Sequence, residues 1–301
     1  MLLAHDLARG YSGPPELTPA RFLTAWTVEP VLLVGVLLAA GLYLAGVRRL
    51  RRRGDAWSAG RTLAFVGGGL GMIVIATMSA LGTYDDTLFS VHMVQHMLLT
   101  MVAPVFLALG APITLALRTA PAGPRRVLLG VLHSRAAAVL AHPVVGWGLF
   151  VGTPFGLYFS GLYEATLRHS FLHLLLHVHL VLVGCLFLWP MLGLDPIPGR
   201  VSYGLRLVLV FAMLPAHAFL GIAIMSGSSV IAGSYYDALG RPWGASPLAD
   251  QHTGGGILWA AGDLVGLLLL GSLFLQWMRA EERLARQEDR RLDRLERAGS
   301  R

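Results

Sequence analysis

Residues 88–109 read LFSVHMVQHMLLTMVAPVFLAL and contain no acidic residue and no arginine or lysine. A helix needs about 20 consecutive apolar residues to cross the hydrocarbon core of a bilayer. Lipid offers no hydrogen-bond partners, so an apolar stretch of this length must be helical, because a helix satisfies its own backbone. The stretch therefore predicts a transmembrane helix that carries two histidines.

Six further stretches of the chain have the same character. Of the 301 residues, 55% are hydrophobic and 14% are charged, whereas a soluble domain carries about 25% charged residues. The sequence therefore predicts an all-α integral membrane protein with a bundle of about seven transmembrane helices over residues 1–278. The charged residues 279–301 are expected to form a helical tail in the cytoplasm. The six further spans are predicted at residues 28–47, 62–82, 137–158, 169–190, 204–226 and 254–277.

Arginine placement predicts the orientation of this bundle. With these spans, twenty of the 24 basic residues lie on one side of the membrane, beginning with the run at residues 48–53. Arg9, Arg21, Arg168 and Arg241 lie on the other side. Basic residues are enriched in cytoplasmic loops. We therefore expect the N-terminus outside, the C-terminus in the cytoplasm and a multi-pass place in the cell membrane. The net charge of +7 is then a topology signal and predicts no nucleic-acid partner.

Five histidines are predicted to lie in the outer half of the bundle. His92 and His96 lie four residues apart, as do His173 and His177, so each pair shares one helical face. At about 1.5 Å per residue, His92 and His173 lie about 6 Å below the outer boundary. His96, His177 and His217 lie about 12–14 Å below it. Ionisable residues inside a membrane predict a functional site, and here they form two tiers near the outer face.

Imidazole is the commonest metal ligand among side chains, and it suits copper, zinc and iron. Asp263 is the only acid far inside a predicted span, and Asp250 lies at the outer end of the same span. Met93, Met97 and Met101 follow the helix of the first histidine pair. Thioether together with imidazole favours Cu(I). The predicted metal ligands are His92, His96, His173, His177, His217, Asp250 and Asp263.

The same residues leave two other cofactors open. His96, His177, His217 and Asp263 could form a catalytic zinc site, which would make the protein a seven-helix zinc hydrolase acting on a lipid amide or ester. Facing histidines such as His96 and His177 could instead bind haem through two imidazoles. Lone membrane histidines also hydrogen-bond to neighbouring helices, and for His217, beside Pro215, that structural role remains open.

Several stretches resemble the CtaG family of membrane proteins, which is associated with assembly of caa-type cytochrome c oxidase. They are residues 89–112, 173–190 and 249–263, with a looser resemblance at residues 214–225. His92, His96, His173 and His177 coincide with family motif positions, as do Asp250, Gln251 and Trp259. His252 stands where the family pattern has glutamine.

The resemblance implies a seven-helix, non-enzymatic factor that helps to make active haem–copper oxidase by handling copper outside the membrane. Its expected partners are membrane lipid, subunits of a haem–copper oxidase and a copper chaperone. The copper prediction itself comes from the ligand types, and the assembly role comes from the resemblance.

Overall fold

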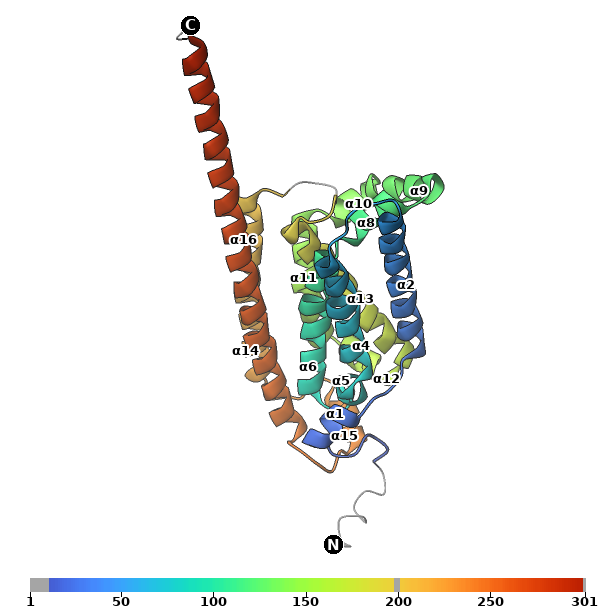
Figure 1. Ribbon diagram of the computed structural model, residues 1–301. Helices are drawn as coiled ribbons and strands as arrows, with labels where there is room; N and C mark the ends of the chain where they lie inside the picture. Colours follow the sequence, from blue (N-terminus) through green and yellow to red (C-terminus); the bar gives the residue numbers. More distant parts are fainter. Residues whose placement is uncertain (1–10, 198–200, 300–301) are drawn as a thin grey trace.

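The computed structural model describes residues 11–197 and 201–299, and every regular element in these residues is a helix (Figure 1). The first half contains α1 (Pro19–Thr24), α2 (Pro30–Arg52), α3 (Ala59–Leu63), the π-helical η1 (Ala64–Leu70), α4 (Gly71–Met78), α5 (Ala80–Tyr84), α6 (Phe89–Met97), the π-helical η2 (Leu98–Val102), α7 (Ala103–Leu109) and α8 (Pro112–Thr119). The second half contains α9 (Ala122–Leu132), α10 (Arg135–Leu140), α11 (Pro143–Tyr158), α12 (Leu162–Arg168), α13 (Ser170–Leu192), α14 (Tyr203–Met225), α15 (Gly233–Leu239) and α16 (Pro247–Gly299).

Six helical stretches of the described chain are long and apolar enough to cross a membrane. They are Pro30–Arg52, Ala59–Tyr84, Phe89–Thr119, Ser170–Leu192, Tyr203–Met225 and Pro247–Leu292. Each overlaps a span predicted from the sequence, and the prediction of an all-helical chain is confirmed. The remaining predicted span, residues 137–158, corresponds to α11, which has 16 residues and packs against α13 and α14. A seventh crossing therefore stays a prediction.

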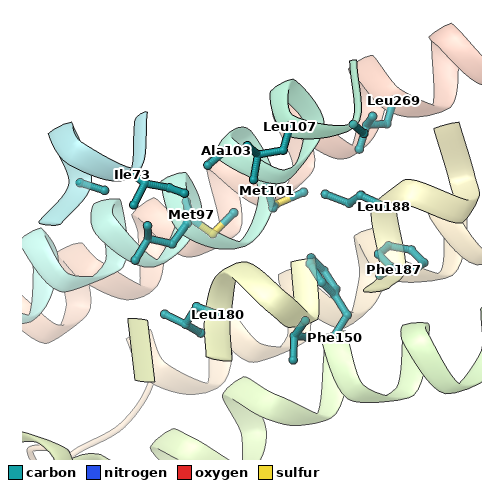
Figure 2. Packing of buried hydrophobic residues seen from close by; sticks show 14 of the residues in the cluster. Ile73, Met97, Met101, Ala103, Leu107, Phe150, Leu180, Phe187, Leu188 and Leu269 are labelled. Carbon is teal, nitrogen blue, oxygen red and sulfur yellow. The ribbon is translucent and has the colours of Figure 1, made fainter. Parts of the chain in front are cut away.

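The segment from α6 to α7 is the centre of the bundle. It packs against η1, α13 and α16, and its stretch is the most buried of the six. Met97 and Met101 project from this segment into the apolar core, where Leu188 of α13 and Leu269 of α16 also lie (Figure 2). Because neighbours on several sides bury the segment, each side chain on it has a defined place in the packing.

Two acidic side chains cap helices that lie far from them in the sequence. The N-cap residue of α6 supplies no side-chain hydrogen bond. Instead, the carboxylate of Asp250 on α16 caps this helix, accepting from Ser90 N at 3.3 Å and from Ser90 Oγ at 2.5 Å. Asp195 accepts from the backbone of Thr114 at 2.8 Å, at the start of α8. A carboxylate at a helix N-terminus satisfies unpaired N–H groups and complements the helix dipole.

The two ends of the bundle differ in charge. Figure 1 shows α1, α5, α12 and α15 together at one end and α8, α9 and α10 at the other. The arginine run that ends α2 lies at the end of α8–α10, together with Arg118, Arg125 and Arg126. From that end α16 continues beyond the bundle without a break, carrying the charged tail (Figure 1).

Gly184 lets α13 approach the central segment closely. A Cβ at this position would collide with the carbonyl oxygen of Thr100 and would lie 2.7 Å from Cγ of Pro104. We expect Gly184→Ala to lower the free energy of unfolding by about 1–3 kcal/mol, because overpacking forces the backbones apart. Thermal unfolding in detergent measures the effect. Gly152→Ala is the control, because a Cβ there meets nothing within 4 Å; equal loss in both variants would contradict this packing.

Candidate metal centre

Two of the predicted histidines converge on a carboxylate. His173 and His177 lie one turn apart on α13, and Asp85 follows α5 in the connection to α6. Nε2 of His173 lies 3.1 Å from Oδ2 of Asp85, and Nε2 of His177 lies 3.3 Å from the same oxygen. One ligand atom from each of the three residues lies within 4.8 Å of the others. We call these three residues the Asp85 centre.

Gln95 of α6 holds the Asp85 centre in place. Its amide nitrogen donates to Asp85 Oδ2 at 2.6 Å and to the carbonyl of Ala76 at 3.0 Å. Its amide oxygen accepts from Nε2 of His177 at 3.0 Å. One side chain therefore joins α4, the Asp85 connection and α13. All polar atoms of this amide are used, as expected for a buried polar group.

The Asp85 centre is buried. Asp85 is 4% exposed and His177 is 6% exposed. Burial alone would raise the pKa of Asp85, but hydrogen bonds from His173 and His177 outweigh it and hold the pKa well below its usual range. Burial, and then the charge of Asp85, raises the pKa of Asp86, the next residue along the chain.

The other predicted histidine pair shares a phenol. Nε2 of His92 lies 3.1 Å from the hydroxyl of Tyr158, and Nδ1 of His96 lies 2.9 Å from it. Tyr158 ends α11, and both histidines are buried. A phenol has one hydrogen, so Tyr158 donates to one imidazole and accepts from the other. We call this arrangement the Tyr158 bridge.

The Tyr158 bridge lies beside the Asp85 centre. The ring centroids of His92 and His173 are 6.4 Å apart, and the ring of Tyr163 lies 4.9 Å from that of His92. Nδ1 of His92 is buried and has no hydrogen-bond partner among the described residues. The structure thus brings together the four histidines that the sequence analysis paired, and it does so through Asp85 and Tyr158.

Three other predicted ligands are engaged elsewhere. His217 donates from Nδ1 to the carbonyl of Met213 at 3.2 Å, and its ring packs against Gly262. Asp263 accepts from the indole of Trp259 at 2.7 Å. Asp250 caps α6, as described above. None of the three belongs to the Asp85 centre, and their role as metal ligands stays a prediction.

The methionines predicted as soft ligands contribute to packing. Met93, Met97 and Met101 belong to the buried apolar core, as does Met213 (Figure 2 labels Met97 and Met101). The side chain of Met93 packs close to Gly254 of α16. Thioether groups of this central segment therefore fill space between helices, a common use of methionine.

Sequence reasoning missed Asp85, Gln95 and Tyr158. A signal was available for Asp85, because Asp85 and Asp86 directly follow an apolar span at the end where the histidine pairs lie. Gln95 lies between His92 and His96 in a stretch that is otherwise apolar. Nothing in the sequence alone placed Tyr158 opposite that helix.

The Asp85 centre could hold a metal ion. It offers two imidazole nitrogens and one carboxylate oxygen, a set that suits first-row divalent metals. Three protein ligands leave further coordination positions free, as in catalytic zinc sites and other exchangeable sites. His173 is the most exposed of the three, with 14% of its side chain accessible.

Comparison with known proteins adds a family. The family described as cytochrome c oxidase caa3 assembly factor (CtaG) matches residues 41–280. Uncharacterized proteins of Mycobacterium bovis and Mycobacterium tuberculosis are each 41% identical to this chain over 298 residues. One of Mycobacterium leprae is 40% identical. These matches cover 96% of this chain but 45% of each relative, so the chain spans less than half of their length. No solved structure matches the chain.

Replacing Tyr158 by phenylalanine tests the Tyr158 bridge. The variant leaves Nε2 of His92 and Nδ1 of His96 without their common partner, and an unsatisfied buried polar group costs about 1–3 kcal/mol. We therefore expect a lower unfolding temperature in detergent. Tyr235→Phe is the control, because Tyr235 packs against the ring of Tyr236 and takes no part in the bridge. Equal unfolding temperatures for Tyr158→Phe and the unmodified protein would argue against the bridge.

Proposed function

We propose that this chain, which belongs to the cytochrome c oxidase caa3 assembly factor (CtaG) family, serves oxidase assembly by binding copper at the extracytoplasmic face and delivering it to an oxidase subunit. The observation that carries the proposal is the convergence of His173 and His177 on Asp85. Copper is the metal that an oxidase factor would supply, and imidazole is one of its common ligands.

The proposed topology is a multi-pass bundle of seven helices with the N-terminus outside. The seventh crossing would be α11, which packs against α13 and α14. With 16 residues, its length is about 24 Å, and the neighbouring α10 lengthens the path toward the arginine-rich end. The positive-inside rule then assigns the end with α8, α9 and α10 to the cytoplasm. The Asp85 centre, which adjoins α5, would face outside.

Delivery requires a site that binds an ion and then releases it to another protein. The Asp85 centre has three protein ligands and a partly accessible histidine, so an incoming ligand could replace the protein ligands one at a time. A copper chaperone would load the site, and a subunit of the oxidase would unload it. The neighbouring Tyr158 bridge, with the unpartnered Nδ1 of His92, offers the next imidazole on the path inward.

The zinc and haem alternatives find less support in the geometry. The zinc set predicted from sequence needs His217 and Asp263 beside His96 and His177, but His217 and Asp263 bond to Met213 and Trp259. For haem, His96 and His177 would have to face one another freely. Instead, His96 belongs to the Tyr158 bridge and His177 to the Asp85 centre. Metal analysis and an absorption spectrum of the purified protein distinguish these alternatives.

Replacement of both His173 and His177 by alanine tests the copper role. We expect the purified double variant to lose bound copper. We also expect cells that carry it in place of the native gene to assemble oxidase with less copper and lower activity. Copper per protein and oxidase activity per haem are the measurements.

His179→Ala is the matched control, because His179 lies on the same helix and contacts Thr153 at 3.1 Å instead of the centre. Normal oxidase activity in cells that lack the whole gene would reject the assembly role. Unchanged copper content in the double variant would reject this site.

A further inference from the structure

We infer that the Asp85 centre binds copper in its oxidised form, Cu(II), with Asp85 as a direct ligand and Gln95 as the residue that positions Asp85. The inference rests on the proposed function and specifies its ligand. It departs from the Cu(I) expectation, which rested on methionines. Three observations carry it: the donor atoms, the hydrogen bonds of Gln95 and the burial of the centre.

The donor atoms are nitrogen and oxygen. Asp85 supplies a carboxylate oxygen, and His173 and His177 supply imidazole nitrogens. Cu(I) prefers soft thiolate and thioether sulfur, whereas nitrogen and oxygen sets are typical of Cu(II). Met93, Met97 and Met101 lie in the apolar core instead. Among divalent first-row metals, a site of nitrogen and oxygen ligands binds Cu(II) most tightly.

Gln95 fixes the position of Asp85. Oδ2 of Asp85 accepts from the Gln95 amide at 2.6 Å and also faces the two imidazoles. The amide nitrogen also donates to the carbonyl of Ala76 at 3.0 Å, which fixes the position of the Gln95 side chain. Partners that orient metal ligands typically contribute about 10–100-fold to metal affinity. Because Gln95 is fully buried, water cannot substitute for it.

The test compares Cu(II) and Cu(I) on the purified full-length chain. Cu(II) is added as its glycine complex, and Cu(I) is added under reductant in a chelator of known affinity. Electron paramagnetic resonance then reports on the bound ion, because Cu(II) has an unpaired electron and Cu(I) has none. We expect one Cu(II) per chain, with a spectrum that shows coupling to imidazole nitrogen, and no stoichiometric retention of Cu(I).

Two variants test the assigned roles. Asp85→Asn keeps the size of the side chain but removes the charge, and we expect it to weaken Cu(II) binding at least tenfold. Gln95→Leu should weaken binding about 10–100-fold and should also change the Cu(II) spectrum, which a purely structural defect would not do. Asp237→Asn is the control, because Asp237 is an exposed acid on α15 at the same end. Thermal unfolding confirms that each variant is folded.

Retention of Cu(I) with a silent spectrum would overturn the inference, as would full Cu(II) affinity in folded Asp85→Asn protein. If Asp85→Asn does not fold, the spectrum of the unmodified protein still decides the oxidation state and the nitrogen ligands. Absence of any copper binding would overturn both this inference and the copper role. Stoichiometric Cu(II) binding with normal oxidase activity in cells that lack the gene would reject the assembly role and leave the inference standing.

Discussion

The hydrogen bonds around Oδ2 of Asp85 are the interaction on which the rest of this site depends. A carboxylate buried at the end of an apolar bundle is stable only if its oxygens are bonded. Gln95, His173 and His177 provide those bonds from α6 and α13. The packing of these helices in turn needs close approaches such as the one at Gly184. The positions of His173 and His177 relative to Asp85 therefore depend on how closely these helices pack.

The membrane explains why the fold could be predicted in outline. Lipid imposes the same demand on every crossing segment, so span positions follow from composition alone. The expected span at residues 28–47 corresponds to α2, and the span at 204–226 corresponds to α14. The short α11 is the exception, because its 16 residues do not meet that demand by length. Its place depends on packing against α13 and α14, which no single segment reveals.

The candidate site could be predicted only in part. His173 and His177 could be paired from the sequence, because residues four apart on a helix lie on the same face. Asp85 comes from a connection whose position depends on the fold of two spans, so periodicity could not find it. The predicted depth in the membrane placed His217 in the same tier as His96 and His177. Depth does not determine the direction in which a side chain points, and the ring of His217 packs against α16. Spacing on one helix also did not reveal that Met93, Met97 and Met101 belong to the buried apolar core.

Family membership points to a role in oxidase assembly, and the geometry points to the residues that could carry it. The family connects the chain with cytochrome c oxidase assembly, and the Asp85 centre supplies a chemical reason for such a role. The Tyr158 bridge places a second pair of imidazoles next to the first, with His92 and His173 in ring contact. In the proposed function, these adjoining imidazoles would let the protein accept an ion and pass it on.

The central claim is that copper binds to imidazole and carboxylate at the Asp85 centre. X-ray absorption at the copper edge of the copper-loaded, full-length protein tests it most directly, because the fine structure identifies the ligand atoms. The account predicts a first shell of nitrogen and oxygen with the outer scattering of two imidazole rings, lost when His173 and His177 are replaced. A first shell containing sulfur, or a spectrum unchanged by those replacements, would contradict it.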